Sequence, residues 1–155
     1  MIIPLFETRL NDDFSTTLVK ESEFSYEVEI LNSPKVIVDM VNCLFDAKHK
    51  AEENIYLIPL NTGGRALGVC HLSKGTINAS LLSPREVFIR ALLCGASNIV
   101  LIHNHPSSRA LPSLSDIEIT KQIREAGDLI NVPLKDHLII GGNSYYSFKE
   151  HELLR

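Results

Sequence analysis

Residues 98–102, Asn-Ile-Val-Leu-Ile, form the run that most restricts how this chain can fold. The run is apolar after its first residue, a pattern typical of a strand that is covered on both faces of a sheet. Before it, Ser83 and Pro84 open a helical apolar pattern that ends near Gly95, and a second helix is predicted over about 115–130. A buried strand between two helices is typical of an α/β domain.

The remaining patterns extend this prediction along the chain. Another helix begins at Ser33 and Pro34. Further strands are predicted at 26–31, 54–60, 65–72, 133–140 and 144–148. We therefore expect one domain over residues 26–155, an α/β sandwich around a mixed sheet. Residues 1–25 have no clean period, and we expect a loose arm with room for one short strand. Such an arm could pair with a second copy in a homodimer.

Composition excludes some classes of protein. With 155 residues and a net charge of −4, the chain does not bind nucleic acid through bulk positive charge, although a local basic patch stays open. No stretch approaches the roughly 20 apolar residues of a membrane helix, so no membrane partner is expected. Three widely spaced cysteines favour reduced thiols and a cytoplasmic protein.

His103 and His105 follow the buried strand directly and carry the strongest chemical signal. Residues i and i+2 of an extended segment point the same way, so both imidazoles can converge on one ion. Pro106 keeps His105 extended. Asp116 lies downstream and can complete a set of two nitrogens and one oxygen, which leaves one position of a zinc ion open. The alternative is a pair of loop histidines without a partner.

Ser113 and Asp116 have a second interpretation. A serine followed three residues later by an acid, just before an apolar helical pattern, is a capping box. Capping is the commoner use of this pattern, and the two roles are compatible because a helix N-terminus favours an ionised carboxylate. A catalytic site also needs a base. Glu53 is the candidate, beside Glu52 at the start of a strand, but the pattern alone does not select it among the acids.

These residues together resemble a known motif. Glu53, His103-x-His105-Pro106 and Ser113-x-x-Asp116 are similar to the JAMM (MPN+) metalloprotease motif. The flanking segments resemble the RadC-like branch of that superfamily, and they are residues 74–80, 83–88, 102–107 and 136–141. The resemblance runs from about residue 26 to the C-terminus.

The resemblance implies a fold and a set of roles. The fold would be the JAB1/MPN domain, a three-layer α/β/α sandwich with a mixed sheet, related to cytidine deaminases. His103, His105 and Asp116 would bind Zn²⁺, Glu53 would be the general acid/base, and Ser113 would steady the oxyanion.

Two departures from the RadC-like pattern stand out. After the second histidine these proteins usually continue Pro-Ser-Gly-Asp/Asn-Pro, whereas this chain has Pro106-Ser107-Ser108-Arg109-Ala110. Arg109 changes the charge at the rim of the site, which puts substrate preference in doubt. Longer members also carry an N-terminal helix-hairpin-helix region, for which we expect no room here, so the family's DNA-repair label transfers poorly.

Two functions are compatible with these residues and with the resemblance. The first is a zinc metallohydrolase that cleaves a peptide or isopeptide-like amide of a peptide or protein substrate, with Glu53 as base. The alternative is a non-catalytic module that docks a protein or nucleic acid, and it needs no base at Glu53. A nucleobase deaminase would require His-x-Glu and Pro-Cys-x-x-Cys, which are absent. His137, beside Asp136 in an apolar strand, is predicted to be a hydrogen-bonded core histidine.

Overall fold

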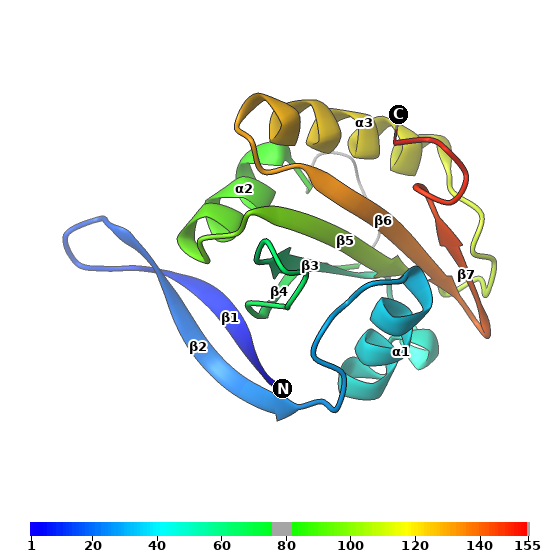
Figure 1. Cartoon of the computed structure of the whole chain (residues 1–155), viewed down its shortest axis with the longest axis horizontal. Coiled ribbons are helices and arrows are strands. Elements are labelled where there is room, and N and C mark those ends of the chain that lie inside the picture. Colours follow the sequence, from blue (N-terminus) through cyan, green and yellow to red (C-terminus); the bar gives the residue numbers. More distant parts are fainter. Residues whose placement is uncertain (76–81, 155) are drawn as a thin grey trace.

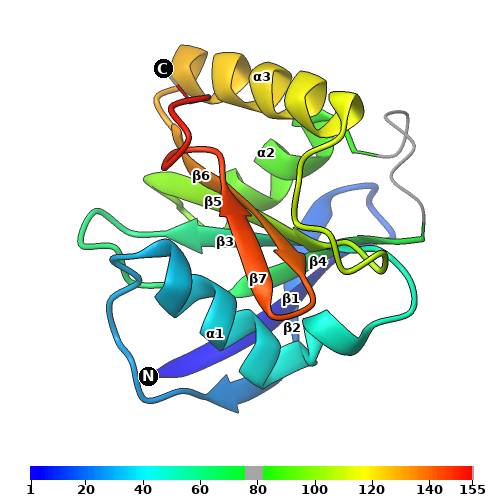
Figure 2. The ribbon, with the colours of Figure 1, turned by 90° about the vertical axis from the view of Figure 1, so that its right-hand side faces the viewer.

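The computed structural model describes residues 1–75 and 82–154, which form three layers (Figure 1). The central layer is a mixed sheet with the strand order β2-β1-β4-β3-β5-β6-β7. Its strands are β1 (Ile2–Leu10), β2 (Thr16–Ser25), β3 (Asn54–Leu60), β4 (Val69–Lys74), β5 (Asn98–Asn104), β6 (Leu134–Gly141) and β7 (Ser144–Ser147). The helix α1 (Pro34–Phe45) covers one face, and α2 (Pro84–Leu93) and α3 (Leu114–Leu129) cover the other (Figure 2). The expected α/β/α sandwich is confirmed.

The helix boundaries follow the capping signals. Ser33 and Ser83 accept hydrogen bonds from backbone N–H groups in the first turns of α1 and α2, and a proline follows each cap. Gly95 ends α2 with a φ of 67°, where the N–H of Ala96 bonds to the carbonyl of Ala91. A short 3₁₀ turn, η1 (Ala47–His49), follows α1 and leads toward β3.

Strand β5 organises the core. All seven of its residues are buried, and it pairs antiparallel with β3 and parallel with β6. Its side chains alternate between two apolar clusters: Val100 and Ile102 pack toward α1, whereas Ile99 and Leu101 pack toward α2 and α3. Continued to the strand's end, this alternation places His103 on the α3 side and Asn104 on the α1 side.

The N-terminal region differs from the expected loose arm. Residues 2–25 form a long antiparallel hairpin, and β1 joins the sheet through parallel pairing of Leu5 and Phe6 with β4. The sequence did not predict this hairpin, because a bulge interrupts its register at Leu5 and Phe6, and because most residues of β2 are exposed and show no apolar alternation. The strand expected at 26–31 is wrong: this segment is irregular, although Leu31 is buried and donates its N–H to the carbonyl of Gly64.

The other expected elements are confirmed with small shifts at their ends. The strand predicted at 65–72 begins later, as β4, after an isolated bridge between Leu60 and Ala66. Most of the RadC-like segment at 74–80 lies outside the described residues. Among the helices of residues 1–75 and 82–154, none combines the length and apolar character needed to cross a membrane.

Candidate metal centre

The imidazoles of His103 and His105 meet at the end of β5. Their Nε2 atoms lie 3.0 Å apart, as expected for residues i and i+2 of an extended segment. The His103 side chain is fully buried and that of His105 is 15% exposed, so the pair has one side closed by protein and one side open to solvent. The loop after β5 orients the His105 ring, because the carbonyl of Arg109 lies 2.9 Å from His105 Nδ1.

A chain of buried hydrogen bonds determines the tautomer of His103. Thr120 Oγ1 donates to the carbonyl of Asp116 and lies 2.6 Å from His137 Nδ1, so it accepts the Nδ1 proton of His137. His137 Nε2 lies 2.9 Å from His103 Nδ1 and must then accept the proton of that nitrogen. Burial lowers the pKa of His137 well below its ordinary value, which keeps this imidazole neutral. The chain therefore leaves the lone pair of His103 Nε2 directed at His105.

His105 presents its lone pair in the same way. Its Nδ1 proton is donated to the Arg109 carbonyl, so the neutral ring carries an unprotonated Nε2. Two lone pairs at 3.0 Å repel each other unless a proton or a cation lies between them. The two hydrogen-bonded histidines are thus arranged as ligands for a metal ion.

Asp116 supplies the third ligand atom from the first turn of α3. One oxygen, Oδ2, accepts hydrogen bonds from the backbone N–H and the hydroxyl of Ser113, at 2.7 and 2.6 Å. The Ser113 oxygen in turn accepts the N–H of Asp116, which completes a capping box. The other oxygen, Oδ1, is buried 3.3 Å from His103 Nε2 and has no hydrogen-bond partner among the described residues. The capping and ligand interpretations of this pattern are therefore compatible.

Glu53, the residue immediately before β3, completes the group. Its Oε1 lies 3.6 Å from His103 Nε2 and 3.5 Å from His105 Nε2, and its side chain is 15% exposed. These four residues form a cluster whose ligand atoms all lie within 4.8 Å of one another. The sequence could not select Glu53 among the acids, but the antiparallel pairing of β3 with β5 brings it beside the histidines.

The charged and polar groups of the cluster shift the pKa values of Asp116 and His105. Burial opposes ionisation of Asp116, but His103, His105 and the Ser113 hydroxyl outweigh it and hold the pKa of this carboxyl far below its usual range. Contact with Asp116 raises the pKa of His105 against the opposing effect of burial. Asp116 is therefore ionised at neutral pH, the form that a cation requires.

The residues present fit a tetrahedral zinc ion. Zinc bonds of about 2.0–2.2 Å to nitrogen and oxygen place neighbouring tetrahedral ligand atoms roughly 3.3–3.6 Å apart. The distance from His103 Nε2 to Asp116 Oδ1 is 3.3 Å, and the Nε2–Nε2 distance of 3.0 Å needs only a small expansion. The buried Oδ1 without a partner is the atom that a cation would satisfy.

Asn104, between the two histidines, is a residue whose role the sequence did not reveal. Its side chain lies on the α1 side of β5, where Oδ1 accepts the N–H of Asn54 at 2.8 Å. Its Nδ2 donates to the carbonyl of Glu52 at 3.0 Å. The amide thus bonds to the backbone on both sides of Glu53 and ties this residue to the strand that carries the histidines.

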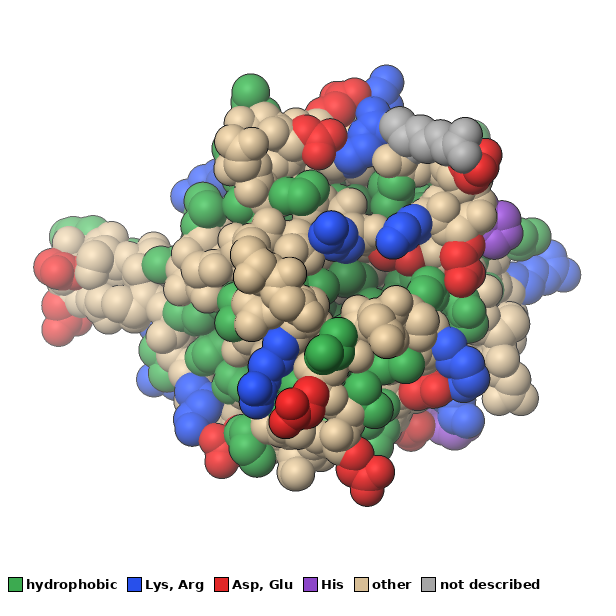
Figure 3. Space-filling view, in the orientation of Figure 1, with side chains coloured by type: hydrophobic (Ala, Val, Ile, Leu, Met, Phe, Trp, Pro, Cys, Tyr) green, Lys and Arg blue, Asp and Glu red, His purple; other side chains and the backbone are tan. Residues whose placement is uncertain are grey.

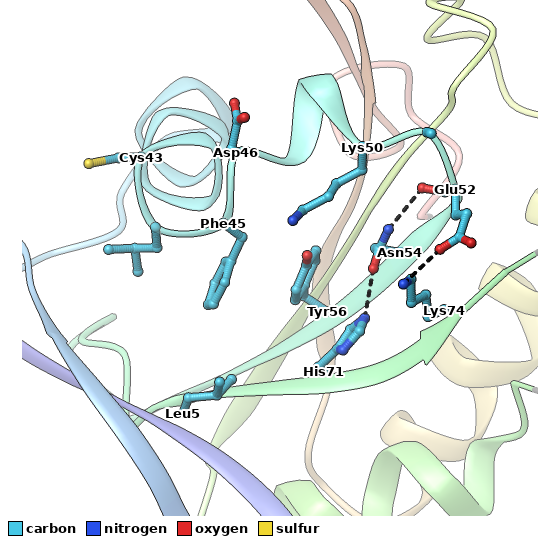
Figure 4. A pocket seen from close by; sticks show the side chains of 12 residues that line it. Leu5, Cys43, Phe45, Asp46, Lys50, Glu52, Asn54, Tyr56, His71 and Lys74 are labelled. Atoms are coloured by element: carbon cyan, nitrogen blue, oxygen red, sulfur yellow. Dashed lines mark hydrogen bonds and ion pairs between the residues drawn. The ribbon is translucent and has the colours of Figure 1, made fainter.

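A cavity on the α1 side shows how the neighbours of Glu53 are held (Figure 4). Lys74 pairs with the carboxylate of Glu52 at 3.0 Å, and His71 Nε2 lies 3.0 Å from Asn54 Oδ1. Asn54 Nδ2 also donates to the carbonyl of Glu52. The cavity measures about 790 Å³ and lies across β3 from the metal cluster. Both residues that flank Glu53 are therefore fixed by side-chain contacts.

We expect Asn104→Ala to displace the Glu53 side chain without abolishing metal binding. The variant leaves the N–H of Asn54 without this partner and removes one of the two donors to the carbonyl of Glu52. An unpaired buried N–H costs about 1–3 kcal/mol of stability. If Glu53 is the catalytic base, its misplacement by about 1 Å would lower turnover by roughly 100-fold. Measurements of kcat, KM and zinc content would test this expectation, and an unchanged kcat would contradict it.

The fold brings together the four residues that the sequence named, His103, His105, Asp116 and Glu53. Ser113 lies beside them, with its hydroxyl engaged by Asp116. His137 is a hydrogen-bonded core histidine, as predicted, but its contact with His103 was missed. Thr120 was also missed, because its distance in sequence from His137 left no local signal.

The sequence comparisons identify the family. A sequence model of the family described as "RadC-like JAB domain" matches residues 31–153. The chain belongs to this family. The matched residues include the whole candidate metal cluster and Arg109, and the match confirms the RadC-like resemblance. Arg109 is exposed, and its backbone carbonyl is the group that orients His105.

Several relatives of this RadC-like domain are named "UPF0758 protein". One from Desulfitobacterium hafniense is 35% identical over 125 residues, which cover 81% of this chain and 54% of the relative. One from Alkaliphilus metalliredigens is 41% identical over 117 residues, covering 75% of this chain and 50% of the relative. One from Finegoldia magna is 44% identical over 98 residues, which cover 63% of this chain and 44% of the relative. The chain spans about half the length of the curated relatives it matches.

Proposed function

We propose that this RadC-like domain is a zinc-dependent hydrolase that cleaves a peptide or isopeptide-like amide. The observation that carries the proposal is the composition of the cluster: two histidines and one buried acid, Asp116, offer three ligand atoms, and a second acid, Glu53, lies beside them at the partly exposed edge. A site that serves structure alone is normally closed by four ligands, whereas a hydrolytic zinc site keeps one position for water and a base beside it.

A zinc ion held by His103, His105 and Asp116 would act as a Lewis acid toward water and toward the scissile carbonyl. The protein's own part is the movement of protons. Glu53 reaches the open side of the cluster, where its carboxylate can take a proton from the attacking water. The same carboxyl can return that proton to the leaving amine, so that the C–N bond breaks as an acid and an amine form.

Ser113 is proposed to donate a hydrogen bond to the oxyanion. Its hydroxyl lies at the edge of a depression of about 310 Å³, whose lining includes Glu53, His105, Pro106, Ser107, Ser113, Ser115 and Asp116. In the structure this hydroxyl donates to Asp116 Oδ2, and rotation about the Cβ–Oγ bond would redirect it. The backbone N–H of Ser113 would still hold Oδ2 after that rotation. One such donor is worth about 3–4 kcal/mol in the transition state.

Metal analysis combined with a cleavage assay tests the proposal. Protein purified without chelator is expected to contain equimolar zinc and to cleave members of a peptide and isopeptide library, with products identified by mass spectrometry. Removal of zinc should abolish cleavage, and added zinc should restore it. Protein without stoichiometric zinc, or zinc-loaded protein that cleaves no amide in a broad library, would count against the hydrolase.

A further inference from the structure

A second cavity lies at the other end of the sheet from the metal cluster. It measures about 290 Å³ and is bounded by the start of α1, the turn between β3 and β4, and the beginning of β6. Figure 3 looks onto a face of the molecule where basic side chains lie beside a central hollow. The volume is at the lower end of the range for small-molecule sites.

The N-terminus of α1 contributes positive electrostatic potential to this cavity. Ser33 and Pro34 line it, and the twelve-residue helix has no acidic side chain in its first turn. The aligned peptide dipoles leave about half a positive charge at such a terminus. Lys35 is paired with Asp39 on the outer surface of the helix, so that carboxylate is already engaged. The helix terminus therefore favours an anion but does not by itself define a site.

Asn98 provides independent evidence for a ligand. Asn98 lines the same cavity and is 8% exposed, and its amide makes no hydrogen bond with any residue in 1–75 or 82–154. Asn104, six residues later on the same face of β5, shows the usual pattern of a buried amide whose oxygen and nitrogen both have partners. The Asn98 amide is thus an unpaired donor and acceptor at the cavity wall.

Lys135 and Lys149 add two cations to the wall. Neither ammonium group forms an ion pair with a carboxylate in the described part of the chain. Asp136 also lines the cavity, but its oxygens are engaged: Oδ1 accepts the N–H groups of His137 and Lys149, and Oδ2 accepts the Ser147 hydroxyl. The lysines therefore leave an excess of positive charge facing the cavity.

We propose that this cavity binds the phosphate group of a small molecule. Phosphate is tetrahedral and offers acceptor oxygens in several directions, which matches donors that converge from the α1 terminus, from Asn98 and from the two lysines. A planar carboxylate has two oxygens and would leave some of these donors unmatched. The Gly63–Gly64 turn at the rim lacks side chains and lets a ligand approach the backbone closely. The proposal does not depend on the hydrolase function.

Isothermal titration with two probes, inorganic phosphate and AMP, tests the proposal at constant ionic strength. We expect saturable binding of at least one probe by the full chain, and at least a tenfold weaker affinity in the double variant Lys135→Ala/Lys149→Ala. The double variant Lys48→Ala/Lys121→Ala changes the net charge equally at exposed positions outside the cavity and should retain binding. Circular dichroism would confirm that each variant is folded.

The two probes distinguish the source of the phosphate. Binding of inorganic phosphate alone would assign the cavity to the free anion, and preference for AMP would assign it to an organic phosphate. A second variant, Asn98→Leu, removes the amide without changing charge and should also weaken binding. Absence of saturable binding for both probes would overturn the proposal, as would equal losses in the cavity variant and the control.

Discussion

Replacing Glu53 by glutamine is expected to abolish amide hydrolysis while zinc stays bound. Glutamine keeps the shape of the side chain but cannot accept a proton, so the step that depends on this carboxylate loses about 10²–10⁴-fold in rate. In the proposed site the three ligand atoms come from His103, His105 and Asp116, three of the four residues of the cluster, and none of them changes. The variant should therefore hold substrate without cleaving it, which makes it suitable for capturing the natural substrate in a pull-down.

The matched control is Glu52→Gln. Glu52 precedes Glu53 directly, but its carboxylate is not part of the cluster and pairs with Lys74 (Figure 4). The same chemical change at this position should leave kcat/KM within a few-fold of the unmodified protein. Zinc content, kcat and KM would be measured for both variants. If Glu53→Gln kept full activity, or if both variants lost activity equally, Glu53 would not be the base.

The proximity of the candidate metal ligands could be predicted from the sequence because their geometry is local. The spacing of His103 and His105 fixes their common direction once the strand is recognised, and the capping pattern places Asp116 in the first turn of a helix. The alternation of the apolar core also follows from residues 98–102. Short-range patterns thus predicted the α/β sandwich and the common direction of the two histidines, whereas the complete cluster was implied by the resemblance to the JAMM motif.

Contacts that hold the cluster could not be predicted, because they join residues far apart in sequence. Asn104 bonds to residues about fifty positions earlier, and His137 contacts His103 across a gap of 34 residues. Sequence reasoning also missed the hairpin of β1 and β2, whose exposed edge strand shows no apolar alternation. The pattern of a single sequence indicates which side chains are buried. The long-range contacts and the hairpin depend instead on which strands pair, and that pattern does not specify the pairing.

Removal of zinc is expected to lower the melting temperature by about 8–16 °C. Zinc bound at a thousandfold excess over its dissociation constant contributes about 4 kcal/mol to stability, and each kcal/mol shifts the midpoint by about 2–4 °C at this chain length. Without the ion, the two Nε2 lone pairs remain 3.0 Å apart and Asp116 Oδ1 stays buried without a hydrogen-bond partner among the described residues. Calorimetry of zinc-loaded and chelator-treated protein measures the difference.

Asp116→Asn separates this effect from a general effect of the chelator. Asparagine retains an oxygen for the capping contacts of Ser113, but it removes the negative charge that a divalent ion requires, so we expect no stoichiometric zinc. The chelator should then leave the melting temperature of the variant unchanged. Acidification should reduce the difference between zinc-loaded and zinc-free protein, because protons compete with the ion for His105, whose pKa is raised by its contact with Asp116. A chelator-induced shift of equal size in Asp116→Asn would mean that the stabilising metal lies elsewhere.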